Sequence, residues 1–210
     1  MQNGLKIVNL GVATLKNINL LIEPGQCVGL TGPSGIGKSL FLRALADLDP
    51  HEGEMWLDGV SSDQIAAPLW RRKVGLLPAE SAWWYDTVGS HFAQTPDQWL
   101  QAVGLAPTVM TWQVIRLSSG ERQRLALVRL LTMQPNVLLL DEPTANLDRE
   151  NTKRVEVLLA NIRQSQRIMI IWVSHDLAQL HRNCGPIYTV SNNQIVVSQN
   201  AQYHSDLVAL

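Results

Sequence analysis

GPSGIGKS, residues 32–39, is the stretch of sequence that decides the fold of this chain. It matches G-x-x-x-x-G-K-[ST] at every fixed position, the apolar run CVGLT precedes it, and SLFLRALADL follows with helical spacing. The glycines let the backbone wrap closely around a polyphosphate, so that N–H groups and a helix N-terminus face the anion. The alternative is a chance glycine-rich turn, which the strand, loop and helix context disfavours. The residues that we expect to bind a nucleotide are Gly32, Pro33, Ser34, Gly35, Ile36, Gly37, Lys38 and Ser39.

Two acidic residues at the end of another apolar run complete this predicted site. In VLLLDEP, residues 137–143, Asp141 ends the run and Glu142 follows it. We expect Asp141 and the Ser39 hydroxyl to hold Mg²⁺, and Lys38 to reach the β and γ phosphates. Burial would favour the neutral form of Asp141 unless a cation offset the cost, and Mg²⁺ is that cation. Glu142 is placed to act as general base on the water that attacks the γ phosphate; the alternative is that both acids lie in a solvated turn.

A second helix start carries small residues and no bulky side chain. In LSSGERQR, residues 117–124, the Ser118 and Glu121 side chains have the spacing of a capping box, which alone explains both residues. It does not explain Ser119 and Gly120, which leave the helix amides and the positive dipole end open to an anion. The chain's own phosphate loop already supplies amides and a lysine. We therefore expect this helix to meet a phosphate presented by another molecule.

The composition restricts the class of protein. Of 210 residues, 46% are hydrophobic and 17% charged, which indicates one globular domain with a substantial core. The net charge of -1 gives no overall attraction for nucleic acid or anionic lipid. We expect Cys27 and Cys184 to be reduced thiols that pack as small hydrophobic residues. The longest apolar run, at 168–173, is far shorter than a membrane span, and the first residues lack the apolar stretch of a leader.

The order of apolar runs and helical patterns predicts an α/β fold, a P-loop NTPase core with a largely parallel sheet. The buried strands of that sheet are predicted at 27–31, 74–77, 137–141 and 168–174. Runs at 5–10 and 15–22 predict an antiparallel β layer before it. Short helical pieces broken by prolines and a glycine predict a small inserted helical subdomain. We expect a single domain over 1–210, with the core at about 1–79 and 126–210 and the helical subdomain at about 80–125.

Taken together, the motifs resemble those of the ATP-binding cassette (ABC) ATPases. LSSGERQR resembles the LSGGQ signature of that family, with Ser119 in place of the first glycine and Glu121 in place of the glutamine. ANLD at 145–148 resembles the family's D-loop, and VSHD at 173–176 resembles the segment that carries its switch histidine. These segments occur in the family's order and at similar spacing. The resemblance covers nearly the whole chain and implies an Mg²⁺-dependent ATP hydrolase.

The resemblance also implies that one copy of the chain holds only half of each site. In this family two cassettes pack head to tail, and each ATP lies between the P-loop of one and the signature helix of the other. It implies a homodimer in which His175 contacts the γ phosphate and the attacking water, and Asp148 couples the two sites. A histidine after a strand would otherwise be taken for a structural residue. The signature residues that would meet the partner's ATP are Ser118, Ser119, Gly120 and Glu121.

The sequence departs from the family pattern in two places. Where the family has a glutamine that contacts Mg²⁺ and relays the nucleotide state, this chain has Ala79, which cannot bind a metal. Two alternatives follow: the adjacent Glu80 substitutes for the glutamine, or the contact is absent. The family stacks adenine on an aromatic residue of its β layer, and residues 9–17, NLGVATLKN, contain none. We expect weaker selectivity for adenine and slower hydrolysis, because stacking contributes about 0.5–1.5 kcal/mol.

The resemblance implies that ATP hydrolysis drives a partner protein in a membrane. The leading hypothesis is the ATPase subunit of a transporter whose permease is a separate chain, bound at the cytoplasmic face of a membrane. The loop SAWWYDTV, residues 81–88, offers Trp83, Trp84 and Tyr85 as anchors for that permease. The alternative is that at least one of the three packs in the subdomain core. Because a cassette does not touch the cargo, the sequence indicates neither the substrate nor the direction of transport.

A regulatory module that closes on ATP, with slow or incidental hydrolysis, is the alternative function. The missing glutamine and aromatic residue favour it, whereas the presence of Lys38, Asp141, Glu142 and His175 favours a competent enzyme. A nucleic-acid partner is disfavoured by the near-neutral charge.

Overall fold

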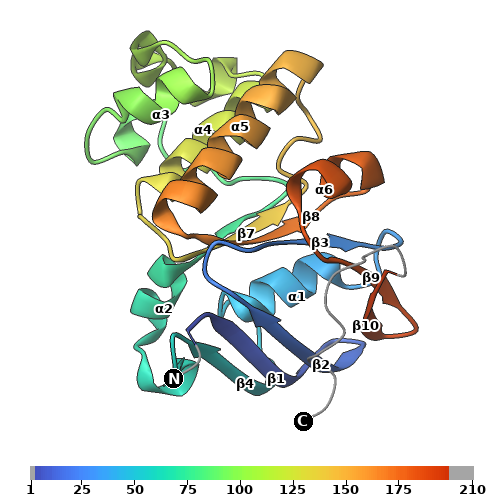
Figure 1. The fold of residues 1–210 in the computed structure, drawn as a ribbon. Helices are drawn as coiled ribbons and strands as arrows, with labels where there is room; N and C mark the ends of the chain where they lie inside the picture. Colours follow the sequence, from blue (N-terminus) through green and yellow to red (C-terminus); the bar gives the residue numbers. More distant parts are fainter. Residues whose placement is uncertain (1–2, 199–210) are drawn as a thin grey trace.

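The computed structural model describes residues 3–198, which form two β-sheets with helices between them and over one face (Figure 1). One sheet is antiparallel with strand order β2-β1-β4-β5. The other has the order β10-β9-β3-β8-β7-β6, and all of its neighbours are parallel except the β10–β9 pair. The strands are β1 (Leu5–Val12), β2 (Leu15–Ile22), β3 (Cys27–Thr31), β4 (Glu52–Leu57), β5 (Val60–Ser61), β6 (Val74–Leu77), β7 (Val137–Asp141), β8 (Met169–Val173), β9 (Ile187–Ser191) and β10 (Gln194–Val197).

The helices lie on both faces of the larger sheet, with α1 on one face and α4 and α5 on the other (Figure 1). The α-helices are α1 (Lys38–Leu45), α2 (Ala67–Lys73), α3 (Asp97–Ala102), α4 (Ser119–Leu131), α5 (Arg149–Gln166) and α6 (Leu177–Asn183). Short 3-10 turns are η1 (Ser62–Gln64), η2 (Gly89–His91), η3 (Pro107–Thr111) and η4 (Val114–Arg116).

The larger sheet is buried on both faces, which explains its continuous apolar runs. Every residue of β7 is buried; Leu139 packs in the core around α1, whereas Leu138 and Leu140 pack in the core beneath α4 and α5. The strands predicted at 27–31, 74–77 and 137–141 have those bounds in the structure. The strand predicted at 168–174 is one residue shorter at each end.

The predicted antiparallel β layer is confirmed, with differences in extent. β2 has the predicted bounds, and β1 continues past Leu10 to Val12. β4 and β5 add two further strands that were not predicted. Helix α1 lies between the two sheets and buries Phe41 and Leu45 there.

Between β6 and α4 the chain forms short helical pieces, α3 and the 3-10 turns η2, η3 and η4, as expected for this segment. Pro96 is the N-cap of α3, and Gly104 follows that helix in a left-handed conformation, with φ 72°. The buried residues of this segment pack with those of α4 and α5 rather than with the antiparallel β layer. We propose that residues from about 80 to 125 act as a subdomain.

The two cysteines lie side by side as free thiols, with 3.0 Å between the Cys27 and Cys184 sulfur atoms. Cys27 is buried and Cys184 partly so, which agrees with packing as small hydrophobic residues. The hydrogen bond with Cys27 and, after it, burial raise the pKa of the Cys184 thiol. Within residues 3–198, no helix has the length and apolarity needed to span a membrane.

Candidate functional site

Three parallel strands bring the predicted catalytic segments to one edge of the larger sheet. β3 pairs with β8, and β8 pairs with β7, all in parallel. The segments that follow these strands therefore leave from the same edge. They are the glycine-rich loop after β3, the acidic pair at the end of β7, and the histidine segment after β8. The structure thus gathers residues that lie more than a hundred positions apart in the sequence.

The backbone of the glycine-rich loop needs glycine at defined positions. Gly32 has φ 144°, and a Cβ there would lie 2.9 Å from the carbonyl oxygen of Val190. Gly37 has φ 107° and is the N-cap of α1. Side-chain-bearing residues rarely adopt such angles, so the sequence pattern follows from the loop's shape. Leu15 of β2 lies against the loop, 3.4 Å from the Cβ position of Gly37.

Lys38 lies across this loop. Its Nζ donates hydrogen bonds to the carbonyl oxygens of Gly32 at 2.8 Å and Pro33 at 2.9 Å. Burial lowers the pKa of Lys38, while the charges of Glu142 and Asp141 act in the opposite direction. The ammonium is therefore held at the loop by the backbone and by the nearby acids.

The acidic pair sits at the point where β7 ends. Asp141 is the last residue of β7 and is 7% exposed. Glu142 has a left-handed backbone with φ 49°, and its amide donates to the carbonyl oxygen of Val173 at 3.1 Å. Its Oε1 is buried and has no hydrogen-bond partner within residues 3–198, and His175 Nε2 lies 3.5 Å from that atom. Burial raises the pKa of Glu142, which the nearby His175 partly offsets.

The start of α4 forms the predicted capping box. Ser118 Oγ accepts from the Glu121 amide at 3.2 Å, and Glu121 Oε2 accepts from the Ser118 amide at 2.8 Å. These two side chains are therefore engaged with each other. Ser119 is exposed at the first position of the helix.

Gly120 has a packing role that the sequence did not reveal. A Cβ at this position would lie 2.9 Å from the carbonyl oxygen of Asn146 and 3.2 Å from Leu147 Cδ2. Close approach of the segment before α5 thus requires glycine, independently of any anion. The start of α4, which carries the predicted signature, and the predicted D-loop are therefore in contact within one chain.

Asp148 is the N-cap of α5. Its Oδ1 accepts from the Asn151 amide at 2.8 Å and its Oδ2 from Asn151 Nδ2 at 2.7 Å, and these hydrogen bonds lower the pKa of Asp148. The cap is a structural role that the sequence reasoning had not assigned to this residue. Ala79, after β6, is exposed, as is the neighbouring Glu80.

The aromatic loop after β6 is organised around His91. The rings of Trp83, Trp84 and Tyr85 lie 4.8–5.1 Å from the His91 ring. His91 Nε2 accepts hydrogen bonds from the amides of Trp84 and Tyr85, each at 3.1 Å. Trp84 is 62% and Tyr85 53% exposed, whereas Trp83 packs against the core. The alternative that at least one of the three is a core residue is therefore confirmed for Trp83.

The aromatic loop is also joined to α4. The Arg129 guanidinium lies 4.6 Å from the Trp83 ring centre and 4.7 Å from that of Trp84. Burial lowers the pKa of Arg129, and its Nη2 donates to the Ala82 carbonyl oxygen at 3.0 Å. The signature helix and the exposed aromatic residues are thus physically connected.

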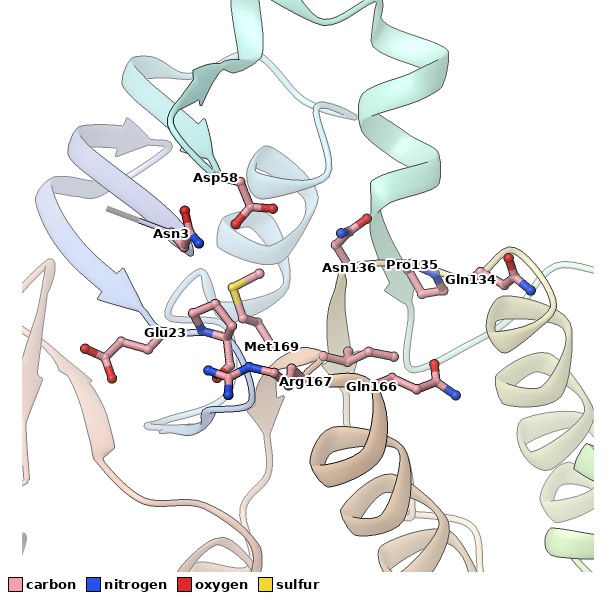
Figure 2. Close-up of a pocket in the computed structure, with 11 residues that line it drawn as sticks. Asn3, Glu23, Asp58, Gln134, Pro135, Asn136, Gln166, Arg167 and Met169 are labelled. Atoms are coloured by element: carbon pink, nitrogen blue, oxygen red, sulfur yellow. The ribbon is translucent and has the colours of Figure 1, made fainter. Parts of the chain in front are cut away.

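An open pocket of about 850 Å³ lies at the opposite edge of the larger sheet, and Figure 2 shows the residues that line it. Asn136 and Met169, which line it, lie at the amino ends of β7 and β8. Asp58, Glu23 and Arg167 also border it. Since Asp141 and Val173 end the same strands, this pocket is separate from the candidate catalytic edge.

Comparison with known proteins shows which family this chain belongs to. The protein-family model described as "ABC transporter" matches residues 15–145. The "Probable sulfate/thiosulfate import ATP-binding protein CysA" of Chlorella vulgaris is 34% identical over 91% of this chain and 87% of that protein. The rice "Protein STAR1" is 35% identical over 82% of this chain, which spans only 54% of STAR1. A dimeric ATP-binding cassette in a post-hydrolysis state, bound to ADP and Pi, has a TM-score of 0.74 at 23% identity, over 91% of this chain and 96% of that one.

The chain belongs to the ABC transporter family. The resemblance found in the sequence and the predicted P-loop NTPase fold are both confirmed. As a member of this family it is an ATP-binding ATPase.

Proposed function

We propose that this chain hydrolyses ATP with Glu142 as the general base and drives a separate membrane permease. The observation that carries the proposal is the meeting of three segments at one sheet edge, where Glu142 and His175 lie 3.5 Å apart beside the lysine-bearing loop. Gly32–Ser39 would hold the phosphates through backbone amides, and Lys38 would exchange its loop carbonyls for phosphate oxygens.

In the proposed reaction, the oxygen of a water attacks the γ phosphorus of ATP. Glu142 takes a proton from that water, while the bond between the γ phosphorus and the bridging oxygen breaks and ADP leaves with the bonding electrons. A raised pKa makes Glu142 a stronger base than an ordinary glutamate. His175 Nε2 faces the same carboxylate oxygen and would orient the water and the γ phosphate.

The residues fit a magnesium ion bound with the nucleotide. A hydroxyl and a carboxylate, from Ser39 and Asp141, are the oxygen ligands that Mg²⁺ prefers. The described residues contain no cluster of three or more protein ligands, which suits an ion completed by phosphate and water. When bound, Mg²⁺ would neutralise charge on the phosphates. Burial of Asp141, with 7% exposure, supports this role because an uncompensated buried carboxylate is costly.

We further propose that each ATP is completed by the signature start of a second copy. Ser119 is exposed at the N-terminus of a 13-residue helix, where the amides and the helix dipole attract anions. Because Ser118 and Glu121 are engaged in the capping box, Ser119 and the first amides would make the main contact. Asp148, beside this surface, would couple the two sites.

The exposed aromatic residues would form part of the permease contact, at the cytoplasmic face of a membrane. Trp84 and Tyr85 are large, exposed and held in place by His91, which suits interface anchors. Trp84→Ala should weaken permease binding roughly 10-fold or more and leave the melting temperature nearly unchanged. Trp83→Ala is the matched control, because loss of its core contacts should lower the melting temperature. Equal effects of both variants on stability and on binding would contradict this assignment.

Steady-state phosphate release tests the catalytic part of the proposal. The wild-type chain, alone or with its permease, should release phosphate from Mg-ATP, and Glu142→Gln should not. A wild type that binds ATP but releases no phosphate in either setting would favour the regulatory module instead.

A further inference from the structure

A buried glutamine joins the two segments that carry Glu142 and His175. Gln179 lies in the first turn of α6 and is 3% exposed. Its Oε1 accepts hydrogen bonds from Thr144 Oγ1 at 3.0 Å and from Ser174 Oγ at 3.2 Å. Thr144 follows Glu142 by two positions, and Ser174 directly precedes His175. One carbonyl oxygen therefore ties both segments.

The other end of the Gln179 amide is anchored on α5. Its Nε2 donates to Glu156 Oε1 at 2.9 Å, and Arg182 donates to the same oxygen at 3.2 Å. A carboxylate only accepts hydrogen bonds, so the amide nitrogen must face Glu156 and the amide oxygen must face the two hydroxyls. The orientation of the amide is thus determined by its partners.

The Ser174 end of this network is also bonded locally. Ser174 Oγ accepts from the Asp176 amide at 3.1 Å while it donates to Gln179. Asp176 Oδ1 accepts from the Gln179 amide at 3.0 Å and caps α6. The residues on either side of His175 are therefore bonded to each other and to the first turn of α6.

The Glu142 segment depends on such support. Glu142 has a left-handed backbone, which costs free energy in a residue with a side chain and persists only where the surroundings hold it. In the described part of the chain, no group forms a hydrogen bond with its Oε1. The path of the backbone therefore contributes to the position of the carboxylate, and Thr144, which is 8% exposed, is one of the points where that backbone is held.

We infer that Gln179 is a positioning residue for hydrolysis, which holds the Glu142 and His175 segments so that the two side chains face each other. The inference rests on the proposed function. Leucine at 179 would leave two buried hydroxyls without an acceptor and Glu156 without one of its donors. Glutamate at 179 would set a second carboxylate against Glu156.

The test measures two quantities for Gln179→Leu: the rate of phosphate release and the dissociation constant for ATP. The kcat should fall at least about 10-fold, while ATP affinity stays within about twofold because the loop at 32–39 is untouched. Thr144→Val should lower kcat in the same way. Thr144→Ser, which keeps the hydroxyl, should retain most of the wild-type rate. The double variant of Thr144→Val with Gln179→Leu should be no slower than Gln179→Leu alone, because both remove one tether.

Met55→Ala is the control for a general loss of stability, since Met55 is fully buried in β4 of the other sheet. It should lower the melting temperature and leave kcat close to wild type. A Gln179→Leu kcat within about twofold of wild type, or an ATP affinity that falls in parallel with kcat, would overturn the inference.

Amide hydrogen exchange separates this inference from the proposed function. Residues 142–147 and 174–176 should exchange faster in Gln179→Leu than in Met55→Ala, whether or not the wild type turns over. Unchanged exchange in both segments would refute the tether. A wild type without turnover would refute the proposed function alone.

Discussion

The loop at 32–39 and the start of α4 are both glycine-containing helix starts, yet they are built differently. At the loop, Lys38 is bonded to backbone carbonyls and lies near the charges of Asp141 and Glu142. At α4 the capping box satisfies its own side chains, and Ser119 is left exposed. The first region gathers a lysine and two acids, and the second is an exposed helix start that we propose as a contact surface. The difference agrees with our proposal that one chain supplies the chemistry of one site and the contact surface of another.

The largest expected effect is on the reactive side. Glu142→Gln should lower kcat by at least about 100-fold, because it removes the general base while keeping the side chain's size. ATP binding should persist, since Glu142 is outside the phosphate loop. Phosphate release and nucleotide titration measure the two quantities. A variant with more than about a tenth of the wild-type rate would show that another group is the base.

The next effect concerns the binding surface. Ser119→Glu should lower turnover by about 10-fold or more, because the new carboxylate would face the γ phosphate on the partner. An acid in the first turn of a helix is favourable by about 0.3–1 kcal/mol, so the folded chain should be no less stable.

Ser119→Ala is the matched control, because it keeps the helix amides. Its turnover should fall much less than that of Ser119→Glu, because only the hydroxyl contact is lost. Full activity of Ser119→Glu would mean that no phosphate approaches this helix start.

A smaller effect is expected on stability. Burial raises the pKa of Glu142 above its usual value, so its contribution to stability is present below the unfolded-state pKa and is lost as the pH rises through the folded-state pKa. Glu142→Gln should therefore be more stable than wild type at neutral pH. Each kcal/mol gained in the free energy of unfolding should raise the melting temperature by about 2–4 °C. The gap should close as the pH falls towards about 4. Thermal melts across this range measure it, and a gap that does not vary with pH would contradict the assigned cause.

The smallest effect concerns the nucleotide base. The β layer places aliphatic Leu15, rather than an aromatic ring, against the loop at Gly37. Lost stacking is worth about 0.5–1.5 kcal/mol, so the affinities for ATP and GTP should differ by no more than about 10-fold. Titration of both nucleotides checks this, and a strong preference for ATP would point to another adenine contact.

The sequence predicted the elements whose pattern reflects burial on both faces. β3, β6 and β7 have their predicted bounds because each is a mainly apolar run that begins after a polar residue and ends at a polar residue, a glycine or a proline. β4, β5, β9 and β10 were missed, since β4 begins with exposed residues and β10 is an exposed edge strand. Strands of mixed exposure have no such pattern in a single sequence.

The site was predictable where a motif encodes its local geometry. Gly32 and Gly37 are glycines because of their backbone angles, and the loop pattern records that need. At position 120 a glycine is required because of the close contact with Asn146. At position 179 the glutamine is required by hydrogen bonds to three separate segments of the chain. Such requirements arise only from tertiary packing, so sequence reasoning had no signal for them.

The most direct test of two half-sites is the association state of Glu142→Gln, which should bind ATP without turning it over. Analytical ultracentrifugation should show a monomer without nucleotide and a dimer with Mg-ATP. The same variant carrying Ser119→Glu should remain monomeric. A Glu142→Gln chain that binds Mg-ATP yet stays monomeric, alone and with its permease, would contradict the account.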